Sequence, residues 1–193
     1  MYDLLIKYFN RYTSRPLNGD EIDLIKSSFT PKKFRKKQYF LQEGELCKYA
    51  AFVIKGAMRR YRVDDKGEEH IIDLFLENWW AIDRESVITK TPTAYFIDAW
   101  EDTDVLVGKA DFTNLIHQVP ALNDWVKKLG ERHDVAQRKR LNAAINMSAE
   151  QRYAELEKTY PEFLQRFPQH IIASYLGINK VTLSRIRGQA SKK

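Results

Sequence analysis

Residues 167–187 read FPQHIIASYLGINKVTLSRIR, and this stretch predicts two short helices joined by a turn. Pro168 suits the start of the first helix, Gly177 suits its end, and Asn179 can cap the second. Ala173 supplies the small side chain that two crossing helices need where they approach. The spacing indicates a helix-turn-helix, with a plain helical hairpin as the alternative. Apolar residues that would hold the pair together are Ile172, Leu176, Ile178, Leu183 and Ile186.

The second helix of such a motif would enter the major groove of DNA with its N-terminal face toward the bases. Arg185 suits a bidentate contact to guanine, Lys180 suits a base or a phosphate, and Val181 suits a thymine methyl group. The outward positions on this face are Asn179, Lys180, Val181, Ser184 and Arg185.

Other polar side chains suit the phosphate backbone, which positions a protein without reading sequence. On and after the second helix they are Thr182, Arg187, Lys192 and Lys193, and near the first helix they are Gln169 and Ser174. Double-stranded DNA is therefore the expected partner.

The charge distribution favours the same end of the chain. The 193 residues carry a net charge of +6. Residues 1–120 hold 18 Lys and Arg against 19 Asp and Glu, whereas residues 121–148 and 149–193 carry net charges of +3 and +4. This asymmetry indicates a polyanion contacted by one end only.

One basic run lies in the otherwise neutral half. We interpret it as a solvated strand edge or turn, because edge strands often carry lysine to discourage pairing. A secondary phosphate contact is the alternative. The run surrounds Phe34 and consists of Lys32, Lys33, Arg35, Lys36 and Lys37.

The rest of the chain predicts an α+β protein. About 30 helical residues come first, and Asn18 with Glu21 can form a capping box there. Short β-rich runs separated by turn residues then fill 34–107, which is typical of a jelly-roll-like β-roll. We predict a β-roll domain over 1–119, a long helix over 120–147 and a DNA-binding domain over 148–193, where Ser148 and Gln151 form a second capping box.

The long helix carries an apolar seam. Its spacing is that of a heptad repeat, so two chains could pair along it. The seam is short, and packing against the chain's own β-roll is almost as well supported. The seam residues are Leu122, Val126, Leu129, His133, Ala136 and Leu141.

The order of β-roll, long helix and helix-turn-helix, together with the string NKVTLSRI at 179–186, resembles the Crp/Fnr family of bacterial transcription regulators. The resemblance implies a cyclic-nucleotide-binding-like domain and a homodimer that pairs along the long helix. It also implies a near-palindromic DNA site, a small-molecule effector and a contact with RNA polymerase.

The sequence departs from the family pattern in three places. Ile82-Asp83-Arg84 stands where members that bind nucleotides carry Gly-Glu-Leu, and Pro92-Thr93-Ala94 stands where they carry Arg followed by Ser or Thr. Pro92 cannot neutralise a cyclic phosphate, so cyclic AMP is not the expected effector. Cys47 is the single cysteine and cannot ligate an iron–sulfur cluster. Residues 160–167 are too few for a full β-hairpin, so we expect the wing to be reduced or absent.

A roll of this kind would enclose an effector pocket. The tandem tryptophans could bind a planar effector, although aromatic pairs at a strand end are more often core residues. The expected lining residues are Trp79, Trp80, Ile82, Asp83, Arg84, Thr93, Ala94 and Tyr95.

The same features exclude other classes of protein. His70 is the only histidine in the β-rich runs over 34–107, so no metal site, cofactor or enzymatic activity is predicted. No apolar run approaches the length of a membrane span, and one cysteine suits a reducing compartment, so a cytoplasmic protein is expected. The alternative function is a ligand-binding or scaffold β-roll that does not bind DNA.

Overall fold

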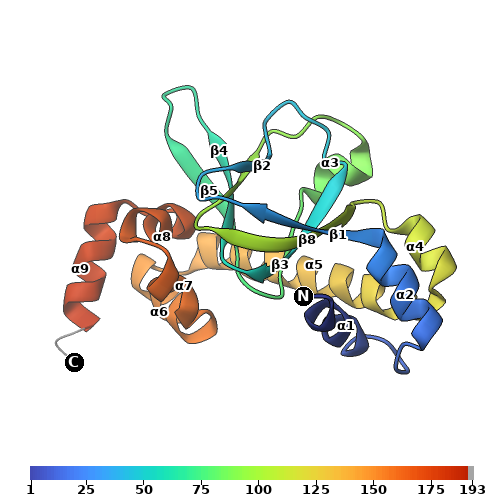
Figure 1. Ribbon diagram of the computed structural model, residues 1–193. Helices are drawn as coiled ribbons and strands as arrows, with labels where there is room; N and C mark the ends of the chain where they lie inside the picture. The colour runs from blue at the N-terminus through green and yellow to red at the C-terminus, as the bar shows by residue number, and fades with distance from the viewer. Residues whose placement is uncertain (191–193) are drawn as a thin grey trace.

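The computed structural model describes residues 1–190 and confirms the α+β class with a jelly-roll-like sandwich (Figure 1). One antiparallel sheet has the strand order β1-β8-β3-β6 and the other has the order β2-β7-β4-β5, so β5 is an edge strand. The strands are β1 (Phe29–Phe34), β2 (Tyr39–Leu41), β3 (Tyr49–Lys55), β4 (Met58–Val63), β5 (Glu69–Phe75), β6 (Trp80–Ala81), β7 (Phe96–Ala99) and β8 (Thr103–Lys109).

Helices cover the two ends of the roll. Near the N-terminus lie α1 (Tyr2–Asn10) and α2 (Gly19–Ser28), and the capping box predicted at Asn18 and Glu21 is confirmed. The short helices α3 (Arg84–Thr89) and α4 (Thr113–Gln118) follow β6 and β8. Figure 1 shows α1, α2 and α4 at one end of the roll and the C-terminal helices at the other.

The long helix begins as a 3₁₀ turn at Pro120–Leu122 and continues as α5 (Asn123–Asn146). Trp125 is fully buried in an aromatic cluster, with ring centroids 4.7 Å from Phe9, 5.0 Å from Phe112 and 5.6 Å from Trp80. Leu122, expected in a seam between two chains, is instead fully buried in this core. The first turns of α5 therefore fasten the helix to its own roll.

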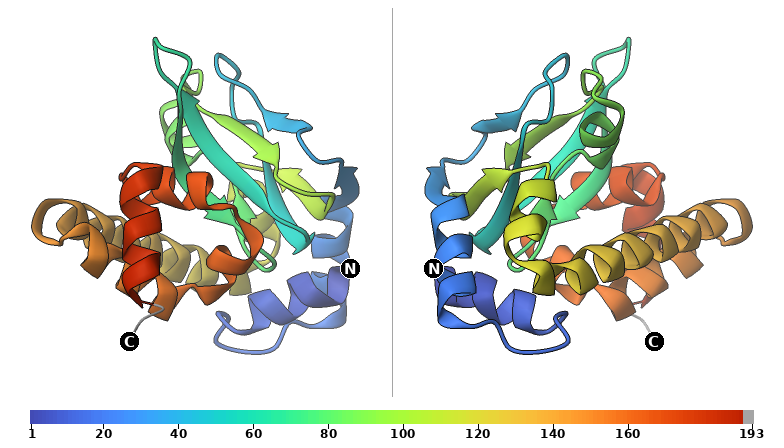
Figure 2. Two further views of the ribbon diagram at one scale, coloured as in Figure 1. Left: turned by 90° about the vertical axis from the view of Figure 1, so that its left-hand side faces the viewer. Right: turned by 90° about the vertical axis from the view of Figure 1, so that its right-hand side faces the viewer.

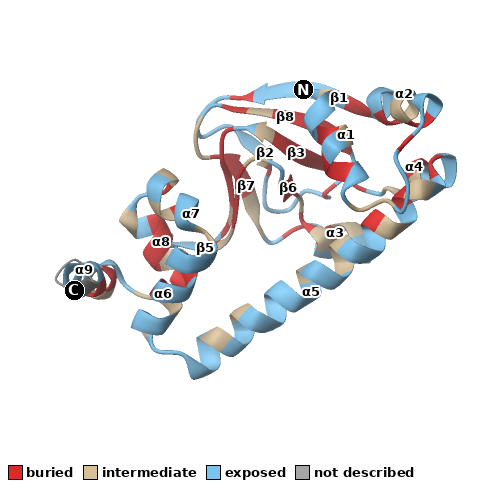
Figure 3. Ribbon diagram, turned by 90° about the horizontal axis from the view of Figure 1, so that it is seen from below, coloured by how far each residue is buried: buried red, intermediate tan, exposed pale blue. Residues whose placement is uncertain are grey.

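Beyond these turns α5 runs past the roll to the C-terminal helices and keeps one side open to solvent (Figures 2 and 3). Val135, Leu141 and Ile145 are 53, 63 and 70% exposed. Within residues 1–190, no helix is both long enough and apolar enough to span a membrane.

Four helices form the C-terminal bundle, namely α6 (Ala149–Thr159), α7 (Pro161–Arg166), α8 (Gln169–Leu176) and α9 (Lys180–Ala190). The capping box at Ser148 and Gln151 is confirmed. Gly177 ends α8 with φ of 65°, a left-handed conformation that glycine adopts without a steric penalty. Between α6 and α8 the described chain forms helix α7 rather than strands, in line with the expected loss of the wing.

We predict that Trp125→Ala lowers the free energy of unfolding by about 3–5 kcal/mol, because the surrounding aromatic rings cannot close the cavity. Urea unfolding measures the change. The control is Val135→Ala on the exposed part of α5, which should change stability by less than about 0.5 kcal/mol. Equal losses in the two variants would contradict the anchoring role of Trp125.

Candidate nucleic-acid interface and effector pocket

One face of α9 is buried and the other is open to solvent. Leu183 and Ile186 pack into the bundle, whereas Val181 is 65% exposed. The other exposed side chains of the open face are Lys180, Ser184 and Arg185. The structure therefore brings together four of the five residues expected to read bases.

The remaining residue, Asn179, serves the helix itself. Its Oδ1 accepts a hydrogen bond of 2.8 Å from the backbone N–H of Thr182, so this oxygen is occupied as a cap. Thr182 is half-buried, and the guanidinium of Arg187 interacts with the phenol of Tyr153 on α6. Gln169 is half-buried at the start of α8. Lys192 and Lys193 lie outside the described residues.

Ser174 differs from its expected role as a phosphate contact. Its Oγ donates to the carbonyl of Glu69 at 3.1 Å and accepts from the N–H of Ile71 at 2.9 Å. Both groups belong to the edge strand β5. Ser174 therefore joins α8 to the roll.

Arg140 makes a second connection at the same edge. From α5 it donates to the carbonyls of Ile71 and Ile72 on β5 and to the carbonyl of Tyr175 at 3.2 Å. Its guanidinium also lies 4.4 Å from the centre of the Tyr175 ring. Sequence reasoning missed Arg140, because nothing in the sequence around it indicates a partner 68 residues away.

Arg166 on α7 forms a third connection, which we call the Arg166 clasp. Its guanidinium pairs with Glu77 at 3.3 Å and with Glu101, and both carboxylates belong to the roll. Trp79, expected to line the effector pocket, instead packs on α7 and the residue before it, with ring centroids 5.5 Å from Tyr160 and 5.8 Å from Phe163. The clasp and this aromatic contact hold the bundle against the roll.

The expected pocket residues Asp83, Thr93 and Tyr95 do come together, and they surround Arg60. Asp83 is 1% exposed and accepts hydrogen bonds from Thr93 at 2.6 Å and from Arg60 at 2.9 Å. Arg60 also pairs with Asp73 at 2.6 Å and lies 4.9 Å from the centre of the Tyr95 ring. Sequence reasoning missed Arg60, although an arginine on a strand with buried neighbours is a signal that a buried carboxylate is near.

Arg84 faces α5 beside this network. Its Nη1 is buried and has no hydrogen-bond partner, and its Nη2 lies 3.9 Å from the position of a Cβ on Gly130. Burial and the charge of Arg84 lower the pKa of His133, so that imidazole is neutral at pH 7. Arg84 therefore places a guanidinium group, with one nitrogen unpartnered in the described residues, between α3 and α5.

The other residues expected in the pocket have different surroundings. Trp80 is buried in the aromatic core with Trp125, so it does not line a pocket. Ile82 packs partly against the core, and Ala94 is exposed.

The residues of the expected dimer seam differ in burial, and pairing with a second chain stays a prediction. Leu129 packs partly against the chain's own core, and His133 is half-buried. Val126, Ala136 and Leu141 remain exposed.

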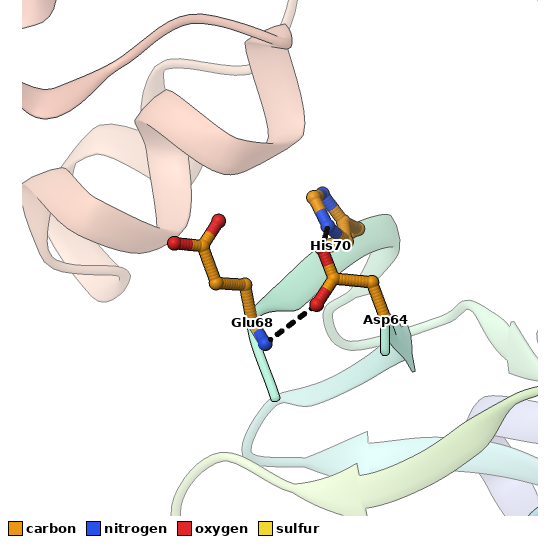
Figure 4. Close-up of side chains that lie close together, drawn as sticks. All are labelled: Asp64, Glu68 and His70. Atoms are coloured by element: carbon orange, nitrogen blue, oxygen red, sulfur yellow. Dashed lines mark hydrogen bonds and ion pairs between the residues drawn. The ribbon is translucent and has the colours of Figure 1, made fainter. Parts of the chain in front are cut away.

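The turn between β4 and β5 gathers Asp64, Glu68 and His70, whose ligand atoms lie within 4.8 Å of one another (Figure 4). Asp64 Oδ1 accepts from the N–H groups of Lys66 and Glu68, and its Oδ2 lies 2.9 Å from His70 Nε2. These hydrogen bonds stabilise the hairpin turn between β4 and β5 and explain why the three side chains lie close together. We assign no ion to them.

The stability that the Arg166 clasp contributes should fall at acidic pH. Burial alone would raise the pKa of Glu77, but hydrogen bonds from Gly56 N–H and Arg166 outweigh it and hold the pKa below its usual value. The ionised Glu77 carboxylate thus stabilises the folded state above about pH 4.5. This stabilisation is lost as the pH falls through the lowered pKa of Glu77.

We predict that the urea midpoint falls on acidification in the wild type and falls less in Glu77→Gln. The variant should also be the less stable protein at pH 7, because it lacks the charge that pairs with Arg166. Glu85→Gln, at an exposed position on α3, serves as the control and should follow the wild type. Identical pH profiles for wild type and Glu77→Gln would refute the clasp.

Comparisons with known proteins agree with this fold. Residues 31–118 match the family described as "Cyclic nucleotide-binding domain". No curated protein sequence matches the chain. The structure is similar to FixK2 from Bradyrhizobium japonicum, with TM-score 0.70, 20% identity and 85% of each chain covered.

Two further solved structures share the arrangement. A CooA mutant from Carboxydothermus hydrogenoformans has TM-score 0.67 and 20% identity, covering 97% of this chain and 84% of that one. The catabolite activator protein of Thermus thermophilus has TM-score 0.53 and 20% identity, covering 91% and 84%. Residues 31–118 are thus similar to cyclic nucleotide-binding domains, and the chain shares the fold of FixK2, CooA and the catabolite activator protein.

Proposed function

We propose that the chain is a sequence-specific DNA-binding transcription regulator that acts as a homodimer. The observation that carries this proposal is the exposed polar face of α9, held outward by a buried apolar face. Residues 163–193 contain six Lys and Arg and no Asp or Glu. Arg166 is paired in the clasp, and Lys192 and Lys193 lie outside the described residues, so Lys180, Arg185 and Arg187 give α9 the positive charge that would face DNA.

In this proposal α9 enters the major groove. Arg185 makes a bidentate contact to a guanine, Lys180 contacts a base edge or phosphate, and Val181 meets a thymine methyl group. Ser184 lies between them on the same face. Gln169, Thr182 and Arg187 lie nearer the backbone, where they position the bundle.

The exposed part of α5 is the proposed dimer contact. Val126, Leu141 and Ile145 present apolar surface that a second copy would bury. Paired chains would place two reading helices about one DNA turn apart, ~34 Å, which matches a near-palindromic site.

The β-roll, over 1–119, is the proposed sensor of a small effector. The pocket network reaches the bundle through charged groups, because Asp73 pairs with Arg60 and lies 3.8 Å from Arg140. Arg140 in turn holds α8 through the Tyr175 carbonyl. An effector that displaces Arg60 from Asp83 would therefore alter the contacts that orient α9.

Selection of bound duplexes from a random-sequence pool tests the proposal. A recovered palindrome would establish DNA binding, pairing of two chains and half-site spacing together. No enrichment, with no binding to duplex DNA even at low salt, would overturn the proposal and favour a scaffold without DNA binding.

Cyclic AMP should bind weakly or not at all. Pro92 offers no guanidinium to the phosphate, and Asp83 already accepts hydrogen bonds from Thr93 and Arg60. Isothermal titration calorimetry measures this directly. A dissociation constant in the micromolar range would contradict the prediction.

Arg185→Ala should reduce discrimination at one base pair by about 1–3 kcal/mol and leave the other positions of the site unchanged. Binding to a panel of single-base variants of the selected site measures the loss. Arg11→Ala, an exposed change at the end of α1, removes the same charge and should not alter discrimination. If Arg185→Ala weakened all sequences equally, Arg185 would be a phosphate contact.

A further inference from the structure

The basic run of residues 32–37, which we call the basic turn, is exposed at the end of β1 and in the link to β2. Hydrogen bonds to backbone N–H groups fix the conformation of this segment. The N–H of Lys36 donates to Asp102 Oδ1 at 2.9 Å, the N–H of Arg35 donates to Gln38 at 3.0 Å, and Lys37 has φ of 69°. The charges are therefore presented from a fixed loop.

Protection of a sheet edge explains only part of this run. Lys32 and Lys33 lie on β1, which is an edge strand, and lysines there discourage pairing with another chain. Arg35, Lys36 and Lys37 lie beyond the end of that strand, where there is no ladder to protect. Protection of the sheet edge therefore does not explain the charges of these three residues.

Carboxylates among the described residues neutralise the turn only in part. Within residues 1–190, the basic turn forms one ion pair, which joins Lys33 to Asp104 at 3.9 Å. The neighbouring Glu101 is held by Arg166. Asp102 accepts the backbone N–H of Lys36 and keeps its negative charge beside the turn, so the five basic side chains still exceed the carboxylates of Asp102 and Asp104. The cluster is thus suited to a polyanion.

The turn adjoins the bundle. Lys36 Nζ lies 5.6 Å from the centre of the Trp100 ring, and that ring lies 6.0 Å from Phe167 and 6.2 Å from His170. Phe167 and His170 flank the start of α8. Figure 1 shows β1 running toward the end of the roll that carries the bundle.

We propose that the basic turn binds the phosphate backbone of duplex DNA that flanks the half-site read by α9. The inference rests on the proposed DNA binding. The first helix of a helix-turn-helix crosses the DNA backbone, so duplex that continues past α8 meets the turn. The turn would supply phosphate contacts that a wing provides where one is present, because this chain has α7 in that place.

The test compares two duplexes that carry the selected site. One ends at the site, and the other extends it by about one helical turn, ~10 bp, on each side. Binding is measured by fluorescence anisotropy over a range of salt concentrations. The proteins are the wild type, the triple variant Lys32→Gln, Arg35→Gln, Lys36→Gln, and the control triple variant Lys7→Gln, Lys48→Gln, Lys109→Gln.

The control removes the same charge from exposed positions, and Lys109 lies at the opposite end of β8 from the strand pair Phe34 and Thr103. In wild type and control, the flanks should raise affinity on the order of tenfold and steepen the salt dependence by at least about two phosphate contacts. The basic-turn variant should lose this gain while binding the short duplex like the wild type.

Two results would overturn the inference. One is the absence of any gain from the flanks in the wild type, and the other is an equal loss in both triple variants, which would indicate net charge alone. Failure of the proposed function is distinguishable, because the short duplex would then bind none of the three proteins.

Discussion

The position of α9 depends on how the edge of β5 is covered. An edge strand leaves backbone N–H and C=O groups without a partner strand, and burying such groups unpaired is costly. Here α8 supplies Ser174 and α5 supplies Arg140 to the outward groups of β5. The bundle therefore docks at one place on the roll, and the open face of α9 takes its orientation from that contact.

The same contact joins the candidate pocket to the bundle. Arg60 pairs with both Asp83 and Asp73, and Asp73 on β5 is shared with Arg140. Charged pairs held away from solvent are sensitive to the loss of one member, because the remaining charge is left uncompensated. In the proposed function, a change at Asp83 would reach α8 through these pairs.

Local signals in the sequence were sufficient to predict the helix boundaries at both capping boxes and the exposed face of α9. The capping boxes at Asn18 and Ser148 and the glycine at 177 act within a few residues, so their structural effect is visible in the sequence itself. The roles of Ser174 and Arg140 were not predictable, because their partners on β5 lie 68 to 105 residues away. Leu122 shows the same limit, since a heptad position does not reveal whether its partner is another chain or the chain's own core.

The amide of Ile71 reports most directly on the docking of the bundle, because its hydrogen bond crosses from β5 to Ser174. Native-state hydrogen exchange of this amide, compared with the amides that pair β4 with β5, measures how often the bundle leaves the roll. We predict protection close to that of the β4–β5 ladder in the wild type, and selective loss at Ile71 in Ser174→Ala but not in Ser184→Ala. Exchange of Ile71 in the wild type at the rate of an exposed amide, beside a protected ladder, would contradict the account.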